Sequence, residues 1–184
     1  FRIAERRIAE MSGRGIVCYI SNFSYLSDPS SVVLRKRLLE HFGRIWIDCL
    51  NGDSRETGKR TPEGDPDPSV FSTQSNRAGI QVGTAVATMV CDGAARSDPG
   101  VRYRSLWGVS KRKQLLDSVQ APPDLHWLYE TVVPRSDNWF SYRPSQSTST
   151  YRSWPSVVHL AASDWFLGLN ENRGGALVSL VQEE

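Results

Sequence analysis

The sequence predicts an α/β fold, and three observations indicate it. Residues 1 to 12 place apolar side chains along one helical stripe, and residues 16 to 20 are then apolar on both alternating faces of a strand. Residues 34 to 42 carry an apolar residue every four positions, which is typical of a helix, and residues 44 to 49 form a second strand-like run. This order of helix, strand, helix and strand, with short links, predicts the crossover repeat of a doubly wound sheet.

The ends of the early elements carry residues with known backbone preferences. Gly13 follows the first helical stripe and is expected to end that helix. Asp28 is a good N-cap and Pro29 suits the first helical position, so we expect the second helix to begin there and to end at Gly43. Because residues 16 to 20 are apolar on both faces, we expect this strand to be buried inside a parallel sheet.

The rest of the chain divides at residues 92 to 100, which are small and polar. Residues 51 to 78 show no periodicity, and a loop of this length in a compact domain is usually functional or disordered. The pattern predicts strands at 79–90, 101–107 and 127–134, and helices at 110–119 and 151–168. We therefore expect a domain at 1–92, built as strand, helix, strand, loop and strand, and a smaller α+β segment at 93–184.

Composition limits the function classes. The 184 residues contain 22 Lys and Arg against 20 Asp and Glu, a net charge of +2, which neither requires nor excludes binding of nucleic acid. Cys18, Cys49 and Cys91 lie far apart in apolar runs, so we expect buried reduced thiols and no metal site. No run approaches the ~18 apolar residues of a membrane span and no signal peptide is evident, so we expect a cytoplasmic protein without a membrane partner.

Several segments resemble one enzyme family. The strand ending in ISNFSYL, followed by DPSSVVLRKRLLEHFGRIWIDCLNG, is similar to the region after the catalytic motif of gamma-class adenine-N6 DNA methyltransferases. The later DPSVFSTQSNRAGIQVGTAVATMV contains a VF pair, a loop and a strand in the order found in that family. VRYRSLWGVSKRKQLL and NENRGGALVSL are similar to the junction into the C-terminal specificity region of Type ISP restriction–modification enzymes, single chains that join nuclease, helicase, methyltransferase and target recognition.

The resemblance implies the C-terminal half of a Rossmann-like methyltransferase sheet, which in the intact enzyme would serve methyl transfer from S-adenosylmethionine to adenine N6. The family's (N/D)PP(Y/F) tetrapeptide, which holds the adenine amino group and stacks on the flipped base, is absent. APPD at 121–124 lacks the leading amide and the closing aromatic, and no glycine-rich cofactor loop is present. We therefore expect no catalytic residue, no cofactor bound by this chain alone, and activity only in a longer protein whose missing N-terminal part precedes Phe1.

Three residues are predicted to form the target-base side of the pocket. In the resembling family the aromatic of the VF pair packs against the flipped adenine, which implies this role for Phe71; the alternative is a loop aromatic that closes the core. Ser21 and Asn22 lie at the C-terminal end of a strand, the edge at which open α/β sheets bind ligands. There they could hydrogen-bond the base or the cofactor, and the alternative is a turn that leads into the next helix.

Basic residues are the candidate DNA contacts, because Lys and Arg neutralise backbone phosphates. They lie in the long loop and around the predicted helix at 110–119, and they are Arg55, Lys59, Arg60, Arg102, Arg104, Lys111, Arg112 and Lys113. Residues 51 to 92 contain four basic and six acidic residues, a net charge of −2, so a solvated loop is an alternative. A solvated helix face is the alternative for the run at 111–113.

Two other functions stay open beside the methyltransferase. The α/β part could be a scaffold in a non-catalytic DNA-recognition module of a larger restriction enzyme, or the chain could be an unrelated nucleotide-binding α/β protein. A sheet of about three parallel strands leaves an edge and an apolar face uncovered, so we expect the isolated chain to associate with itself. DNA and the missing part of the same protein are the other expected partners.

Overall fold

The computed structural model describes residues 1–93, 100–120, 128–145 and 149–155, and all structural statements concern these residues. By its contacts the chain divides into two compact units, Phe1–Ser145 and Gln146–Glu184. The described part of the second unit is the short helix α4, Ser149–Arg152, and the turn after it. Most of the helix predicted at 151–168 and the APPD segment therefore lie outside the described residues.

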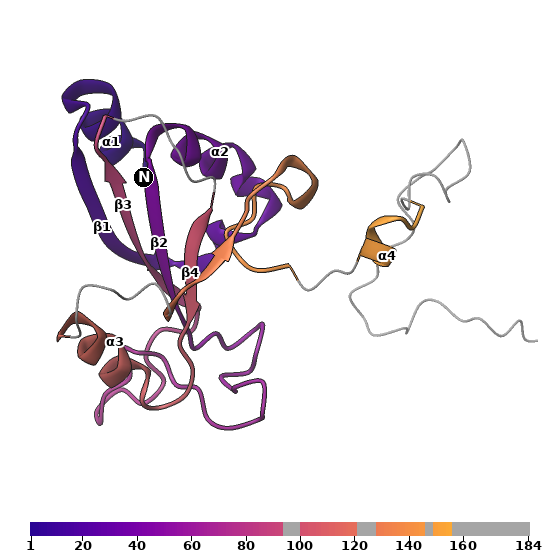
Figure 1. The fold of residues 1–184 in the computed structure, drawn as a ribbon. Coiled ribbons are helices and arrows are strands. Elements are labelled where there is room, and N and C mark those ends of the chain that lie inside the picture. Colours follow the sequence, from indigo (N-terminus) through magenta and orange to yellow (C-terminus); the bar gives the residue numbers. More distant parts are fainter. Residues whose placement is uncertain (94–99, 121–127, 146–148, 156–184) are drawn as a thin grey trace, which may run out of the picture. The chain divides into compact units, whose positions relative to one another are not determined.

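The first unit contains the strands and the longer helices (Figure 1). In chain order the elements are α1 Arg2–Glu5, β1 Gly15–Asn22, α2 Val32–His41, β2 Arg44–Asn51, β3 Thr84–Cys91, β4 Val101–Ser105, α3 Lys111–Gln120 and β5 Glu130–Val132. A π-helical segment, Arg6–Ser12, continues α1 up to Gly13, whose φ of 68° ends it. The α/β class and these predicted elements are confirmed, although β3 begins later than predicted.

The sheet is mixed rather than parallel. Its strand order is β1-β3-β2-β4-β5, and β3 runs antiparallel to both β1 and β2. β2 and β4 pair in parallel, and β5 is antiparallel to β4 at the far edge. Strands β1, β2 and β4 therefore share one direction, as the predicted crossover through α2 requires, while β3 is inserted between the first two.

Strand β1 corrects one prediction. It pairs with β3 on one side only, so among the described residues it is an edge strand. Val17 points into the core and is 7% exposed, whereas Ile16 and Ile20 point to the other face and are 65% and 43% exposed. The expectation that this strand is buried on both faces in a parallel sheet is wrong, because its apolar residues on one face lack a covering layer in the described chain.

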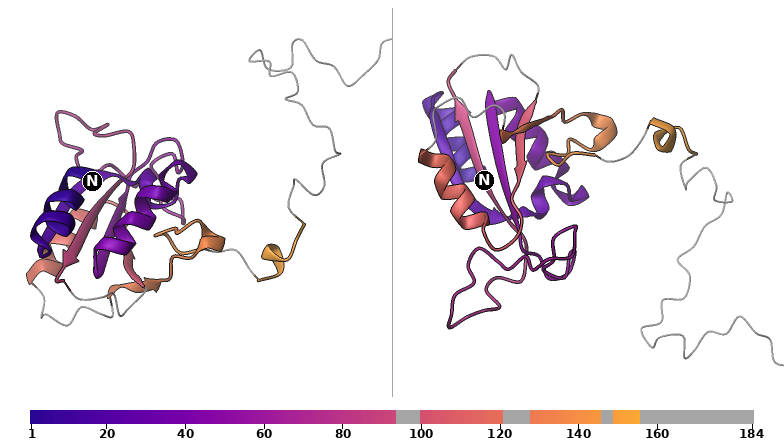
Figure 2. Two further views of the ribbon diagram at one scale, coloured as in Figure 1. Left: turned by 90° about the horizontal axis from the view of Figure 1, so that it is seen from above. Right: turned by 60° about the horizontal axis from the view of Figure 1, so that its bottom comes forward.

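One face of the sheet carries the core. Aligned residues of five strands lie on it together with Leu38 and Phe42 of the α2 region, and Ala4 of α1 and Ile8 of the π-helical segment pack against this core. The strand residues are Val17, Ile45, Ile47, Cys49, Ala85, Ala87, Met89, Val101, Tyr103 and Val132. On the opposite face Arg104 of β4 donates to Ser118 of α3 at 3.2 Å, so α3 lies over part of that face while Ile16 of β1 stays exposed (Figure 2).

The start of α2 follows the sequence prediction. The Asp28 carboxylate accepts the Ser30 backbone N–H at 2.8 Å, and Pro29 opens a 3-10 turn that leads into α2. Arg35 of this helix is fully buried and donates to the backbone carbonyls of Tyr25 at 2.8 Å and Trp139 at 2.7 Å. These bonds link α2 to the turn before it and to the late segment around Trp139.

The predicted boundary after residue 92 falls inside this sheet. β4 and β5 follow the boundary in sequence but pair with β2 and with each other. The first compact unit extends to Ser145. That the residues after 93 begin a specificity segment stays a prediction.

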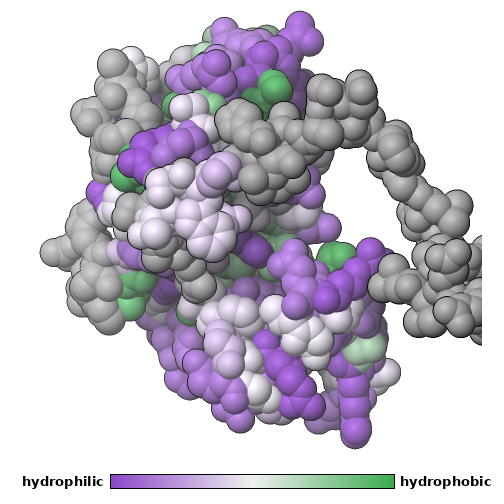
Figure 3. Space-filling view, turned by 90° about the vertical axis from the view of Figure 1, so that its right-hand side faces the viewer, coloured by the Kyte–Doolittle hydropathy of each residue, from purple (hydrophilic) through white to green (hydrophobic). Residues whose placement is uncertain are grey.

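The cysteines and the surface complete the description. Cys49 is buried and Cys91 is half-buried, but Cys18 is exposed on the open face of β1, so the expectation of a buried thiol is wrong there. In the described parts of the chain, no helix is long and apolar enough to cross a membrane, and no group of three His, Cys, Asp or Glu side chains is placed to hold a metal ion. The side of the molecule in Figure 3 is mostly hydrophilic, with hydrophobic residues as separate spots.

Candidate functional site

The structure brings the three predicted base-pocket residues together. Ser21 and Asn22, at the C-terminal end of β1, and Phe71, from the long loop, line one hollow of about 180 Å³. Its other walls are Ile20, Ile80, Val82 and Thr84. The hollow thus lies at the edge where the sequence placed it, with an aromatic ring on one side and polar groups on another.

The local geometry tests the two alternatives given above, a loop aromatic that closes the core at Phe71 and a turn at Ser21 and Asn22. Phe71 is 42% exposed and is not a member of the core cluster, so it does not close the core. The Asn22 side-chain oxygen accepts the Ser24 backbone N–H at 2.8 Å, which makes the turn that the alternative reading expected. Its side-chain NH₂ group has no partner among the described residues and is available to a ligand.

A larger hollow of about 340 Å³ adjoins the first one. Ile20 and Phe71 line both hollows, so together they form the partition between them. The larger hollow is lined by apolar residues of β2, the loop and α3, namely Leu50, Val70, Leu115 and Leu116. Ser72, Thr73 and the charged Arg112 also line it. An apolar wall with one cationic group suits a ligand that has a flat apolar part and an anionic part.

The loop that carries Phe71 runs from β2 to β3 without helix or strand of its own, apart from a bridge between Arg60 and Pro66. Asp53 closes its base. One carboxylate oxygen accepts the N–H groups of Arg55 and Glu56 at 2.6 Å, and the other accepts the Gly83 N–H at 2.8 Å. Burial by itself would raise the pKa of Asp53, but these backbone N–H groups hold the pKa below its usual value.

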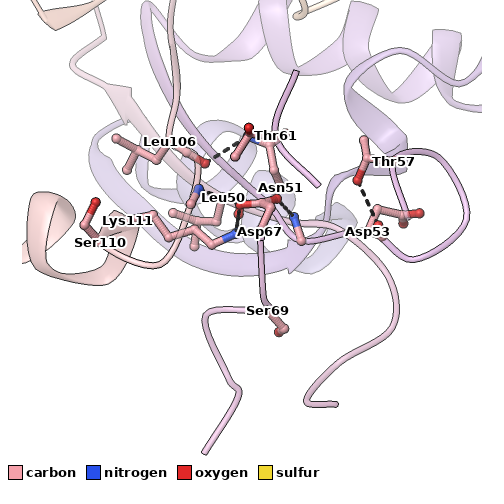
Figure 4. A network of polar contacts seen from close by, with 12 residues as sticks. Leu50, Asn51, Asp53, Thr57, Thr61, Asp67, Ser69, Leu106, Ser110 and Lys111 are labelled. Atoms are coloured by element: carbon pink, nitrogen blue, oxygen red, sulfur yellow. Dashed lines mark hydrogen bonds and ion pairs between the residues drawn. The ribbon is translucent and has the colours of Figure 1, made fainter. Parts of the chain in front are cut away.

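A second buried carboxylate, Asp67, fixes the middle of the loop (Figure 4). It is fully buried and forms an ion pair with Lys111 of α3, with 2.7 Å between Nζ and Oδ1. Lys111 Nζ also donates to the Leu50 carbonyl at 2.7 Å. Burial lowers the pKa of Lys111, and the neighbouring Asp67 carboxylate opposes that shift.

Two of the predicted DNA contacts are corrected by this burial. Lys111 is 2% exposed and bonded inside the protein, so it does not reach a phosphate. Arg104 is 8% exposed and donates to Asp48 at 2.6 Å, with its guanidinium 4.9 Å from the Tyr129 ring centroid. Both residues connect elements of the fold, and we remove them from the candidate interface.

The other basic residues lie nearer the surface. Arg55, Arg60, Arg112 and Lys113 are exposed. Arg60 donates to the Gly64 carbonyl at 2.8 Å, and Lys113 pairs with Asp117 one helical turn away at 2.5 Å. The half-buried Lys59 and Arg102 donate to Ala78 and Thr131, respectively. Of the candidate set, Arg112 lines the larger of the two hollows described above, which Phe71 also lines.

Burial also changes the charge of the loop. Of the six acidic residues at 51–92, Asp53 and Asp67 are buried inside the fold, which leaves four acidic against four basic residues nearer the surface. The net charge of residues 51 to 92 is −2 when all charged groups are counted, but it is zero when the two buried aspartates are left out. One of the remaining acids, Glu56, also pairs with Arg143 at 3.4 Å.

The glycines that follow β2 and β4 have their backbone N–H groups bonded inside the fold. Gly52 follows β2, but the space for its Cβ is filled by Ser69 Cα at 3.0 Å, and its N–H is bonded to Asp67 at 2.7 Å. Gly108 follows β4, and its N–H is also bonded to Asp67 at 2.7 Å. Neither N–H group is therefore free to bind a cofactor phosphate or carboxylate.

Sequence reasoning missed the groups that build this site. The sequence does not indicate that Asp53, Asp67 and Lys111 are buried, because each lies in a polar segment with other charged residues. One signal in the sequence pointed to Asp67, since Asp65, Asp67 and their neighbouring prolines form a rigid segment just before Val70-Phe71. No sequence signal links Asp67 to Lys111, because the 44 positions between them are bridged only by the fold.

Comparison with protein-family models gives no match, and comparison with curated protein sequences gives none either. Solved structures do match. A nuclease-deletion mutant of the Type ISP restriction–modification enzyme LlaGI in complex with a DNA substrate mimic has a TM-score of 0.54 and 20% identity, over 79% of this chain and 13% of that one. The ATP-dependent Type ISP restriction–modification enzyme LlaBIII bound to DNA has a TM-score of 0.57 and 14% identity, over 80% and 9%.

A third match, the DrdV–DNA complex, has a TM-score of 0.53 and 20% identity, over 74% of this chain and 12% of that one. At these identities the likeness is one of fold, and this chain spans between 9% and 13% of the length of the proteins it matches. The chain therefore has the fold of one part of much longer restriction–modification enzymes that were solved with DNA.

Proposed function

We propose that this chain supplies the target-base side of the pocket in an S-adenosylmethionine-dependent adenine-N6 DNA methyltransferase of a restriction–modification system. One observation carries the proposal. The exposed Phe71 lines a hollow at the C-terminal end of β1 that Ser21 and Asn22 also line. Phe71 would stack on the flipped adenine, which contributes ~1–3 kcal/mol for one base.

The size and chemistry of the hollow support a single base as its ligand. At about 180 Å³ it is smaller than the roughly 300 Å³ at which pockets for drug-sized ligands begin, so a flat ring fits better than a whole cofactor. The free NH₂ group of Asn22 can donate to a ring nitrogen of the base. Arg112, which lines the adjoining hollow, would meet a DNA phosphate beside the extruded nucleotide.

The remainder of the enzyme would provide the chemistry. When bound there, S-adenosylmethionine supplies the methyl group, and an (N/D)PP(Y/F) motif outside this chain would hold the adenine amino group. The free edge of β1, with Ile16 65% exposed, supports a place for further strands and a covering layer from the same protein. The DNA-bound Type ISP enzymes that share this fold support DNA as the partner.

The experiment is the Phe71→Ala substitution in the intact enzyme, with methyl transfer from labelled cofactor and DNA binding measured on the same preparation. Loss of one stacked base should lower methylation on the order of tenfold to a hundredfold. DNA binding should change by less than about threefold, because most of the affinity comes from phosphate contacts. Phe71→Trp keeps an aromatic face and should retain most of the methylation.

Three results would contradict the proposal. Unchanged methylation in Phe71→Ala would remove the stacking role. A parallel loss of binding and methylation would favour a non-catalytic DNA-recognition module instead. Identification of a labelled base other than N6-methyladenine, or no labelled base at all from the unsubstituted enzyme, would remove the proposed activity.

A further inference from the structure

The buried pair of Asp67 and Lys111 ties together three segments that are far apart in sequence. Asp67 Oδ1 accepts from Lys111 Nζ and from the Gly108 N–H, and Oδ2 accepts from the Gly52 N–H, all at 2.7 Å. Lys111 Nζ donates in addition to the Leu50 carbonyl. The end of β2, the middle of the loop and the start of α3 therefore meet at one point (Figure 4).

The segment after Asp67 is clamped between two glycines. A Cβ on Gly52 would lie 3.0 Å from Ser69 Cα and 3.2 Å from the Pro68 carbonyl oxygen. A Cβ on Gly79 would lie 2.9 Å from the Ser72 backbone nitrogen and 3.0 Å from Ser69 Cβ. The backbone on both sides of Phe71 is thus packed so closely that only glycine fits opposite it.

Phe71 lies in the chain between Ser69 and Ser72, the two residues that pack against these glycines. Its backbone N–H donates to Ser69 Oγ at 3.2 Å, and the Ser72 N–H closes a turn onto the Ser69 carbonyl at 2.9 Å. Ser69 is 5% exposed, while the Phe71 side chain is 42% exposed. A rigid backbone therefore presents an open ring.

We infer that the Asp67–Lys111 pair and Gly52 are positioning elements, which hold the Phe71 ring at the distance and tilt that the flipped base requires. None of the three lines the smaller hollow, so they act through Phe71 rather than on the base. The inference rests on the proposed function of Phe71. A displacement of about 1 Å at such a ring can cost on the order of a hundredfold in rate, so a device that fixes it matters for turnover.

Two pairs of matched variants in the intact enzyme test this. Lys111→Met removes the cation, and Lys36→Met, at an exposed position of α2, is its control. Gly52→Ala pushes against Ser69, and Gly58→Ala is its control, since both glycines have positive φ (75° and 62°) but a Cβ on Gly58 meets nothing within 4 Å. Gly52→Ala keeps both partners of the Asp67–Lys111 ion pair. It therefore provides the test if Lys111→Met fails to fold.

The readouts are kcat and KM for methylation of DNA, and the fluorescence of 2-aminopurine placed at the target adenine. Lys111→Met and Gly52→Ala should lower kcat by about tenfold to a hundredfold with KM changed by less than about threefold. The 2-aminopurine should stay brighter in the bound complex, because the ring no longer stacks on it. Both controls should match the unsubstituted enzyme.

A double-mutant cycle with Phe71→Ala separates the two claims. If the clamp acts through the ring, Gly52→Ala has no further effect on kcat in the Phe71→Ala background. Independent, multiplying effects would overturn the inference, and so would unchanged kcat and fluorescence in folded Gly52→Ala. If Phe71→Ala alone changes neither readout, the proposed function fails instead.

Discussion

The carboxylate of Asp53 reaches across 30 positions to the backbone N–H of Gly83, at 2.8 Å. It thereby joins the two ends of the loop that carries Phe71. Its second oxygen accepts two N–H groups at the loop's beginning. A hydrogen bond to a charged acceptor contributes about 1.5–3 kcal/mol to stability, more than a bond between two neutral groups. Asp53 accepts three such bonds.

Asp53→Ala should therefore lower the free energy of unfolding by about 3 kcal/mol, since three donors lose their acceptor and water replaces only part of it. Urea unfolding followed by circular dichroism measures the change. Asp65→Ala, an exposed aspartate of the same loop, is the control and should change stability by less than about 0.5 kcal/mol. An equal effect of both substitutions would contradict the closing role of Asp53.

Acid should weaken the fold through the same residue. Because the pKa of Asp53 is lower in the folded chain than its ordinary value of 3.8, its contribution is fully present above that value and is lost as the pH falls through the lower native pKa. Glu5, whose pKa is lowered by Arg37, Arg2 and His41 against the effect of burial, acts in the same direction. Unfolding free energies measured from pH 7 down to about pH 2 should be flat at first and then fall.

The Asp53→Asn variant provides the check on that assignment. It should show a smaller decrease of stability below about pH 4 than the unsubstituted chain, because one of the groups that take up a proton on unfolding is gone. Identical acid profiles would show that Asp53 does not contribute. The comparison depends only on the difference between two curves, so other carboxylates cancel.

Arg35 should be one of the most sensitive residues for stability. Its fully buried guanidinium donates to the backbone carbonyls of Tyr25, Asp28, Trp139 and Phe140, and the last two residues both have positive φ. Arg35→Met leaves these carbonyls without a donor and should cost about 3–5 kcal/mol. The exposed neighbour variant Lys36→Met should cost less than about 0.5 kcal/mol.

Hydrogen exchange can locate that effect. In Arg35→Met the amides of residues 139 to 142 should lose protection first, because the guanidinium no longer holds this segment to α2. Uniform loss of protection over the whole sheet, or unchanged stability, would contradict this account.

The exposed edge of β1 should drive self-association of the isolated chain. Ile16 and Ile20 are exposed, and β1 has a partner on one side only among the described residues. A lysine on an edge strand opposes pairing with another chain, so Ile16→Lys should lower the apparent mass in light scattering toward that of one chain. Val33→Lys, at an equally exposed position on α2, should leave the apparent mass unchanged. A concentration-independent monomer in the unsubstituted chain would rule out the effect.

Local signals in the sequence were sufficient for most elements. The Asp28-Pro29 start of α2, the end of the first helix at Gly13 and the strand character of β1, β2 and β4 all follow from neighbouring residues. The insertion of β3 between β1 and β2 does not follow from neighbouring residues, because an apolar run does not indicate whether the strand will pair in parallel or antiparallel. The exposure of Ile16 follows from that pairing and was therefore missed.

The site was predictable only in part for the same reason. The positions of Phe71, Ser21 and Asn22 depend on strand ends, which the sequence marks, and the fold brings all three to one hollow. Lys111 and Arg112 are adjacent basic residues, yet one is buried against Asp67 and the other lines a hollow. Their difference arises from the turn of α3 relative to the loop, which a sequence does not reveal.

The strand order has a consequence for how the chain folds. Cys18 of β1 and Thr88 of β3 are paired neighbours although 70 positions separate them, and β2 also needs β3 as a partner. During synthesis at ~5–20 residues per second, β1 therefore waits several seconds, without its partner strand, until Thr84–Cys91 has emerged. Such non-local pairing slows folding and exposes apolar segments meanwhile. The long loop thus lengthens the interval during which β1 has no partner strand in the nascent chain.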